Sequence, residues 1–315
     1  MLLYRLKYLS NFRHRLKIFL LASVIIFSFL SCSETDDFFD TYHWKNSSPS
    51  EQNLNGDLLD QLNQKIRNGE YGDIHSLLIM RNGYLVFEEY YRGYSQNQLH
   101  QIFSVTKSIT SALIGIAIDH GKITTLDKKL LSFFPEYASI SNLDSSKQKI
   151  KLEDVLTMRT GLYWDEFRYP FSDPRNSIYQ IMNSSDWVKY VLDLPMVYEP
   201  GTGRTYNTGC TILLAGIIKN LYGIQAHDLA QQYLLNHLGI FESNWETGAK
   251  GITNTGWGLH LKPRDMMKFG LLYLNLGNWE GKRIISENWI RTSTKKYVSV
   301  SGGFSYGYHW WMMPL

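Results

Sequence analysis

Phe103-Ser104-Val105-Thr106-Lys107 stands directly before the apolar pattern that decides the fold. Apolar residues then recur at helical spacing up to Gly121, a natural helix C-terminal cap, at positions Ile109, Ala112, Leu113, Ile116 and Ala117. Other apolar residues (Val105, Ile114, Ile118) lie off that stripe. The sequence therefore predicts a buried helix over residues 104–120, with a serine and a lysine in its first turn.

Ser104 and Lys107 are expected to be neighbours, because positions i and i+3 of a helix lie on the same face. A serine hydroxyl is a poor nucleophile until a base takes its proton. A lysine can do so where burial or nearby positive charge favours its neutral amine. The helix N-terminus adds partial positive charge and free backbone N–H groups, which suit an oxyanion. S-x-x-K alone also arises by chance as an exposed polar pair, but the buried helix favours the catalytic interpretation.

A second candidate segment is the turn-rich loop over residues 200–209, PGTGRTYNTG, which precedes another apolar helix expected from about Thr211 to Leu221. A tyrosine on this loop beside Lys107 could act as a base or relay a proton to a leaving group. A structural role for Tyr206 is the alternative, since the chain holds 21 tyrosines.

The rest of the chain reads as alternating helices and turns. Leu58, Leu59, Leu62 and Ile66 predict a helix that Gly69 closes. Residues 76–80 and 84–88 predict two strands joined by Asn-Gly, a strong hairpin signal. Pro263 suits the first turn of a helix running to about Asn275, and Ser286 caps a last helix through Trp289.

Residues 18–30 form an apolar stretch that is too short for a membrane span of about 20 residues. Five basic residues precede it, which is typical of a secretory signal: Arg5, Lys7, Arg13, Arg15 and Lys17. The small residue Ser31 before Cys32 predicts a lipoprotein-type signal over residues 1–32, with Cys32 lipidated and a polar linker over residues 33–55. An ordinary signal peptide or a short anchor is the alternative. We expect an exported protein, lipid-anchored to a bacterial cell membrane and facing the periplasm or the cell surface.

The composition indicates a globular protein, with 315 residues, 44% hydrophobic residues and 19% charged residues. The net charge of +3 comes from the leader, so no basic patch suggests nucleic acid. The nine histidines show no metal-binding spacing, and we expect no cofactor. Cys210 within an apolar helix is interpreted as a core residue, with a nucleophile as the alternative.

The motifs together resemble the beta-lactamase-related serine hydrolases, which include class C beta-lactamases, DD-peptidases, esterases and 6-aminohexanoate-dimer hydrolases. The matching segments run in family order over about residues 55–315. They are the hairpin with Arg81-Asn82-Gly83 and Glu88, residues 103–121, Phe134-Pro135-Glu136, residues 156–162 (LTMRTGL), Glu199-Pro200-Gly201-Thr202, residues 206–209, residues 258–266 (GLHLKPRDM) and residues 306–311 (YGYHWW).

The resemblance implies Ser104 as the acylated nucleophile, Lys107 as its proton partner and Tyr206 as the tyrosine of the family's Y-x-N element. Thr208 takes the asparagine position of that element, which favours the esterase and amide-hydrolase branch over true beta-lactamases, and Asn207 is assigned no role. The family's later K-T-G or H-x-G strand is expected to be missing, because the sequence stops at Leu315. His237-Leu238-Gly239 matches that motif only by letter.

The predicted fold is α/β of the beta-lactamase/transpeptidase-like type, over residues 56–315. An antiparallel sheet is flanked by helices and joined by a mostly helical lobe, with the C-terminal strands missing. The predicted reaction is hydrolysis of a small ester, amide or peptide-like substrate through an acyl-enzyme on Ser104. The rivals are a truncated, inactive lipoprotein and a penicillin-binding module without turnover. The oligomeric state is left open.

Overall fold

The computed structural model describes residues 44–313, which fall into two compact units. The first unit contains the described residues up to His100, with Lys262–Leu272 and Trp279–Gly281. The second contains Gln101–Leu261, Tyr273–Asn278 and the residues from 282 onward. The predicted signal peptide, Cys32 and most of the predicted linker lie outside the described residues.

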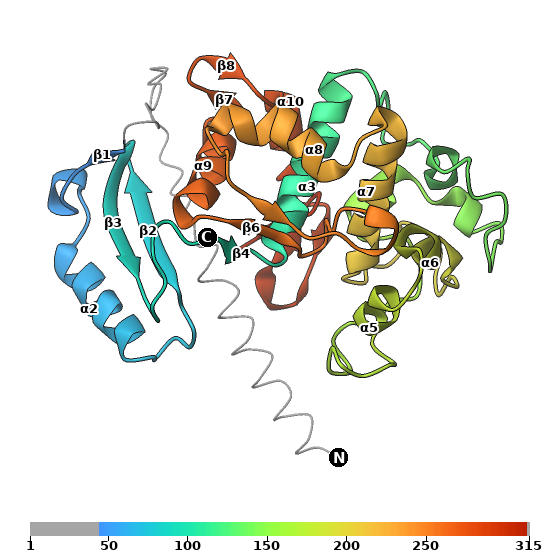
Figure 1. Cartoon of the computed structure of the whole chain (residues 1–315), viewed down its shortest axis with the longest axis horizontal. Helices are drawn as coiled ribbons and strands as arrows, with labels where there is room; N and C mark the ends of the chain where they lie inside the picture. Colours follow the sequence, from blue (N-terminus) through green and yellow to red (C-terminus); the bar gives the residue numbers. More distant parts are fainter. Residues whose placement is uncertain (1–43, 314–315) are drawn as a thin grey trace. The chain divides into compact units, whose positions relative to one another are not determined.

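The first unit is built on a three-stranded sheet in the order β1-β3-β2 (Figure 1). Strands β2 (Ser76–Arg81) and β3 (Tyr84–Tyr90) form the predicted antiparallel hairpin. Both turn residues have positive φ, 51° at Asn82 and 79° at Gly83, as this tight turn requires. Strand β1 (Lys45–Asn46) pairs in parallel with β3, so regular structure begins inside the segment predicted as a linker.

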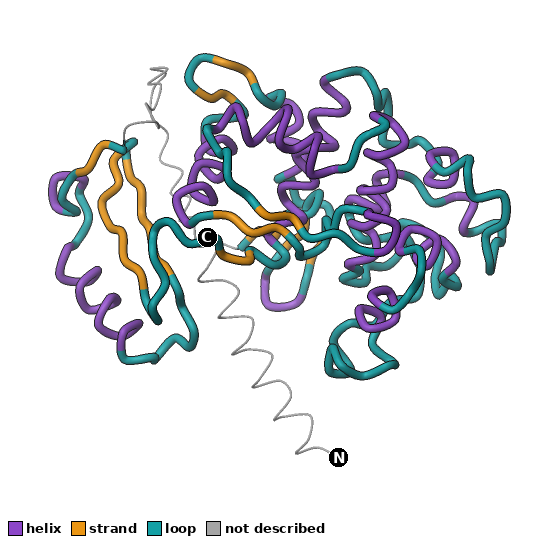
Figure 2. The backbone as a smooth tube through the Cα atoms, viewed as in Figure 1, coloured by secondary structure: helices purple, strands orange, loops and turns teal. Residues whose placement is uncertain are grey.

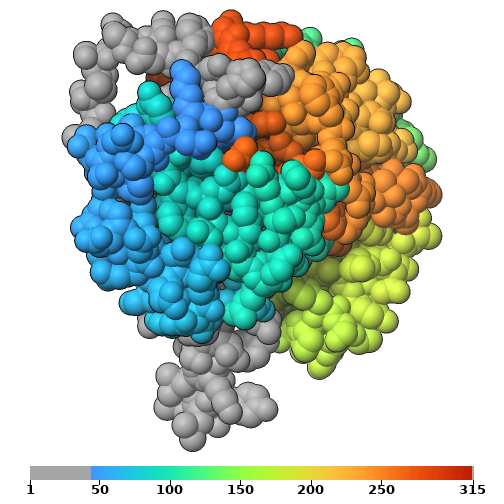
Figure 3. Space-filling model, turned by 60° about the vertical axis from the view of Figure 1, so that its left-hand side comes forward, coloured from blue at the N-terminus to red at the C-terminus, as the bar shows by residue number. Residues whose placement is uncertain are grey.

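One helix covers a face of this sheet: α2 (Gly56–Arg67), where Asn55 accepts a hydrogen bond from the Leu58 amide at 3.1 Å. Ile66 packs with Ile74 and Tyr91, and Leu62 borders this small core. Leu58, predicted on the apolar stripe, is instead 59% exposed. The blue and teal residues of this unit make a continuous surface in Figure 3.

Two buried helices form the centre of the second unit: α3 (Val105–Asp119) and α7 (Thr208–Tyr222). Positive φ values of 69° at Gly121 and 72° at Gly223 end the two helices where the sequence predicts. Cys210 is fully buried in α7, and burial raises the pKa of its thiol to about 12, as expected for a core residue.

The other elements are short, and Figure 2 shows that long strands are confined to the β2–β3 hairpin. Helices are α4 (Leu152–Leu156), α5 (Ser177–Met182), α6 (Trp187–Asp193), α8 (Ala226–Ala230), α9 (Pro263–Leu274) and α10 (Glu287–Ser293). A π turn (Gln231–Leu235) and 3-10 turns (Ser50–Gln52, Leu130–Phe133, Lys147–Lys149, Asn236–Leu238, Ala249–Gly251, Ser301–Gly303) connect them. Strands are β4 (His100–Gln101), β5 (Asn244–Trp245), β6 (Leu259–Leu261), β7 (Asn278–Trp279), β8 (Lys282–Arg283), β9 (Val298–Ser299), β10 (Ser305–Tyr306) and β11 (Trp311–Met312).

Several local predictions can be compared with these elements. Helix α9 begins at Pro263, and in α10 Ser286 accepts a hydrogen bond from the Trp289 amide at 3.3 Å. His237 lies in a 3-10 turn that Gly239 ends, rather than on a strand. Within residues 44–313, none of the helices is long and apolar enough to cross a membrane.

Candidate active site

Ser104 stands at the N-terminal cap of α3, after a strained turn. Phe103 has a φ of 45°, which is unusual for an aromatic residue. The amides of Val105 and Thr106 donate to the carbonyls of Ile102 and Phe103. The Lys107 amide likewise donates to the Ser104 carbonyl at 3.1 Å, so of the free N–H groups that the sequence predicts here, three are occupied by bonds within the turn. The Ser104 amide is not used in these turn bonds, and it lies next to the Ser104 hydroxyl.

Lys107 reaches back along α3 to Ser104, as the spacing predicts. Its Nζ lies 3.2 Å from Ser104 Oγ and 2.7 Å from the carbonyl oxygen of Gly256. The Lys107 side chain is only 2% exposed. The sequence does not indicate a carboxylate as its partner. Nζ donates to the Gly256 carbonyl and at the same time faces the Ser104 hydroxyl. This arrangement is what a general base for Ser104 requires.

Tyr206 joins this pair from the loop before α7. The centroid of its ring lies 5.1 Å from Lys107 Nζ. The ring stacks on Trp311 at 5.9 Å and packs against Phe167 at 5.6 Å and Tyr306 at 6.4 Å. The structure therefore brings together the three residues predicted as catalytic, Ser104, Lys107 and Tyr206, within one unit.

Thr208, the fourth predicted site residue, is the first residue of α7 and is 2% exposed. A Cβ added to Gly256 would lie 2.5 Å from Thr208 Cγ2, so only glycine fits beside it. Asn207 has a structural role, because its side chain caps α7 by accepting from the Cys210 amide at 3.3 Å. Gly256 is a residue that sequence reasoning missed: its contribution is a carbonyl oxygen, which leaves no signal in the side-chain pattern.

Glu166 is a second residue that the sequence does not single out. It is 6% exposed, and its Oε2 accepts hydrogen bonds from Trp164 Nε1 and from the Thr208 amide, the latter at 3.1 Å. Burial raises the pKa of the Glu166 carboxyl, while the charge of nearby Lys107 opposes the shift. Glu166 therefore ties the start of α7 to the surroundings of Lys107.

Arg204 lies against Tyr206, and His309 lies against the neighbouring Tyr306. His309, expected in a core or surface role, is 2% exposed, and Ser108 Oγ of α3 donates to its carbonyl oxygen at 2.8 Å. Burial lowers the pKa of His309 to about 3, and Lys107 and Arg204 add to this shift. The Arg204 guanidinium lies over the rings of Tyr206, Tyr306 and Trp311.

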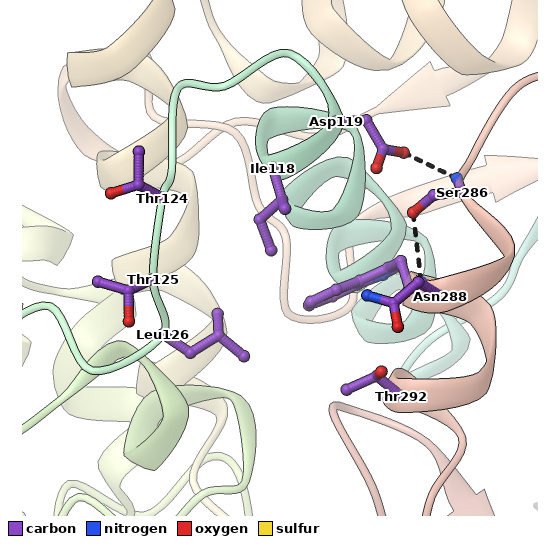
Figure 4. A pocket seen from close by; sticks show the side chains of 9 residues that line it. Ile118, Asp119, Thr124, Thr125, Leu126, Ser286, Asn288 and Thr292 are labelled. Atoms are coloured by element: carbon purple, nitrogen blue, oxygen red, sulfur yellow. Dashed lines mark hydrogen bonds between the residues drawn. The ribbon is translucent and has the colours of Figure 1, made fainter.

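A hollow at the opposite end of α3 is a separate feature (Figure 4). Asp119, Trp289 and Thr292 are among the residues lining this cavity of about 240 Å³. The Asp119 carboxylate accepts from the Ser286 amide at 2.8 Å, which ties α3 to the start of α10. With a rise of about 1.5 Å per residue, α3 puts roughly 20 Å between this hollow and Ser104. Within residues 44–313, no group of three or more His, Cys, Asp or Glu side chains is placed to hold a metal ion.

A buried lysine bonded to a serine at the start of a buried helix, with a tyrosine beside it, defines a serine-hydrolase-like site of the serine–lysine type. The comparison with known families gives the same class. The chain belongs to the beta-lactamase family, whose family model matches residues 72–315.

Among curated relatives, the 6-aminohexanoate-dimer hydrolase of Paenarthrobacter ureafaciens is 23% identical over 258 residues, which are 75% of this chain and 63% of that protein. Two related proteins of Mycobacterium tuberculosis are 21% identical over 240 residues, 62% of this chain and 59% of their own length. The chain thus spans about three fifths of the length of the curated relatives it matches.

Solved structures define the fold. A provisionally named 6-aminohexanoate-dimer hydrolase from Bacillus anthracis matches with a TM-score of 0.66 and 23% identity, over 81% of this chain and 67% of that one. A class C beta-lactamase solved with cefoxitin matches with a TM-score of 0.61 and 20% identity, over 84% of this chain and 76% of that one. The beta-lactamase/transpeptidase-like α/β fold predicted from the sequence is confirmed.

Proposed function

We propose that this protein hydrolyses a small ester or amide through a covalent acyl-enzyme on Ser104. The observation that carries the proposal is the contact of 3.2 Å between Lys107 Nζ and Ser104 Oγ, in a setting where the lysine is almost fully buried. If Lys107 had a purely structural role, there would be no reason for its hydrogen-bond partner to be a serine hydroxyl at the N-terminal, positive end of a helix.

Acylation proceeds from this contact. As Ser104 Oγ bonds to the substrate carbonyl carbon, its proton passes to Lys107 Nζ, and the carbonyl oxygen becomes an oxyanion. The helix end and the Ser104 amide stabilise that negative charge. When the bond to the leaving alcohol or amine breaks, the proton is returned to the leaving group, with Tyr206 as the relay beside Lys107.

Deacylation reverses these roles. A water molecule gives a proton to the same lysine–tyrosine pair and attacks the acyl carbon, which releases the acid and restores the Ser104 hydroxyl. Thr208, packed beside Gly256, is the proposed substrate-binding residue. The relatives named as 6-aminohexanoate-dimer hydrolases support an amide or a peptide-like compound as the substrate class.

The location proposed for this activity follows from the leader. A lipid chain on Cys32 would anchor the exported protein to a bacterial cell membrane, facing the periplasm or the cell surface, with residues 33–43 between the lipid and the described structure. The mass of the N-terminal peptide of the mature protein tests this, because lipidation adds fatty acyl groups to a peptide that begins at Cys32. An unmodified peptide or another start site would contradict it.

The catalytic test is release of p-nitrophenol from a p-nitrophenyl ester by the full chain. Ser104→Ala is expected to abolish it, and Lys107→Met to lower kcat on the order of 100- to 10,000-fold, the usual contribution of acid–base catalysis. Ser108→Ala, on the same helix, is the matched serine control. Lys147→Met is the matched lysine control, because Lys147 is 1% exposed and bonded to two backbone carbonyls.

Mass spectrometry after a fluorophosphonate probe locates the reactive residue independently, and Ser104 is the expected site. Activity that survives Ser104→Ala, or labelling elsewhere, would overturn the proposed nucleophile. A penicillin-type probe that stays attached to Ser104 without ester turnover would instead identify a penicillin-binding module.

A further inference from the structure

The turn over residues 254–258 carries the carbonyl that holds Lys107, and side chains from several segments hold the turn in place. Four successive carbonyl oxygens of the turn each accept a hydrogen bond from a side chain: Asn254 from Trp245 Nε1 at 2.8 Å, Thr255 from Thr110 Oγ1 at 3.3 Å, Gly256 from Lys107 Nζ at 2.7 Å, and Trp257 from Gln101 Nε2 at 3.2 Å. The position of Lys107 Nζ therefore depends on how this turn is held.

Glu246, the residue after β5, closes the two ends of the turn with its backbone. Its amide donates to the Gly258 carbonyl at 2.9 Å, and its carbonyl accepts from the Asn254 amide at 2.8 Å. These bonds do not involve the side chain, so a substitution at position 246 leaves them in place. They also bring the Glu246 carboxylate next to the turn.

The Glu246 carboxylate accepts hydrogen bonds from β4, from β6 and from the turn itself. Oε1 accepts from His260 Nε2 at 3.0 Å and from Gln101 Nε2 at 3.5 Å, and Oε2 accepts from Asn254 Nδ2 at 3.3 Å. Two of these partners also bond to the far end of the turn. Asn254 Oδ1 accepts from the Trp257 amide at 3.3 Å, and Gln101 donates to the Trp257 carbonyl.

The contact with Asn254 sets this carboxylate apart from an ordinary surface ion pair. The side chains of Glu246 and His260 are 41% and 23% exposed, and exposed ion pairs contribute little to stability. Asn254 is only 2% exposed, and buried polar groups need hydrogen-bond partners. The carboxylate therefore determines which way the Asn254 amide group faces, and with it the shape of the turn.

We propose that Glu246 is a positioning residue of the candidate active site. Its carboxylate holds the turn over residues 254–258, and the turn holds Lys107 at the distance from Ser104 that proton transfer needs. This inference rests on the proposed function, because it concerns how the general base of that reaction is kept in place. Since Glu246 acts only through the turn, its loss should lower kcat and leave KM unchanged.

The kinetic test measures kcat and KM for p-nitrophenyl acetate with the full chain, together with urea unfolding of each variant. Glu246→Ala is expected to lower kcat roughly 10- to 100-fold, because a small displacement of a catalytic group has an effect of this size. Glu246→Gln keeps one acceptor oxygen and should lose less. Glu287→Ala is the matched control, because Glu287 is 46% exposed and paired with Arg291 at 2.7 Å on α10, and it should leave kcat unchanged.

An exchange of the two side chains tests the same hydrogen bond with its direction reversed. Asn254→Asp alone places two carboxylates side by side and should lower kcat. In the double variant Glu246→Gln/Asn254→Asp, the new glutamine can donate to the new aspartate, which can still accept from the Trp257 amide. The double variant should therefore be faster than Asn254→Asp alone, whereas two independent effects would multiply.

Wild-type kcat in Glu246→Ala would overturn the inference and leave the proposed function standing. A double variant no faster than Asn254→Asp, or a fall in kcat that only follows the folded fraction, would overturn it as well. If Glu246→Ala unfolds at the assay temperature, the nearly isosteric Glu246→Gln gives the same comparison. Wild-type protein that neither turns over the ester nor reacts at Ser104 with a fluorophosphonate would refute the proposed function, and this inference with it.

Discussion

His309 offers a pH test of the packing around the candidate site. Burial, with Lys107 and Arg204 close by, lowers the pKa of this histidine to about 3 in the folded protein. In the unfolded chain an ordinary histidine has a pKa near 6.5. Between these values the unfolded state holds a proton that the folded state lacks. The contribution of neutral His309 to the free energy of unfolding is therefore fully present above about pH 6.5 and is lost as the pH falls toward 3.

The size of the effect follows from this difference. Linkage predicts that from pH 7 to pH 5 the histidine lowers the free energy of unfolding by roughly 2 kcal/mol. Urea unfolding followed by tryptophan fluorescence, at pH 7, 6 and 5, gives this quantity. The comparison variant is His309→Asn, because asparagine does not titrate and tolerates the left-handed φ of 61° at this position.

The wild type should lose about 2 kcal/mol more than His309→Asn over that pH range. His237→Asn is the matched control, since His237 is only partly buried and should change the pH slope much less. Parallel pH profiles for the wild type and His309→Asn would show that His309 is not buried as a neutral ring, and the packing derived for residues 306–311 against α3 would be wrong.

Two further predictions concern other positions in the fold. Gly115→Ala should lower the melting temperature in calorimetry, because the added Cβ would lie 2.2 Å from Trp289 Cδ1, and overpacking by about 1–3 kcal/mol exceeds the helix-propensity gain of about 1 kcal/mol. Gly56→Ala, with nothing within 4 Å of the new Cβ, should not lower it, and equal effects would contradict the packing. Glu166→Gln should gain stability relative to the wild type as the pH rises from 4 to 7 in urea unfolding, because burial raises the pKa of Glu166 and its ionisation in the folded state is unfavourable. A pH-independent difference would show that Glu166 ionises normally.

Much of the local structure could be predicted from residue patterns. Apolar spacing located α3 and α7, and Asn82-Gly83 located the hairpin turn, because these signals depend on neighbours within a few residues. The helical stripe of α2 was only partly right, since Leu58 is exposed. Which side of a helix is covered depends on elements distant in sequence, and spacing alone cannot supply that information.

The sequence by itself determined that Ser104 and Lys107 meet, because helical geometry puts positions three apart on one face. It also determined the family, through an ordered set of motifs. Only the tertiary structure decided what surrounds the pair: the Gly256 carbonyl 149 residues away from Lys107, the buried Glu166, and Arg204 over the Tyr306 ring. Such contacts arise when loops from different parts of the chain pack against α3. This packing sets how far each side chain is buried and which charges surround it.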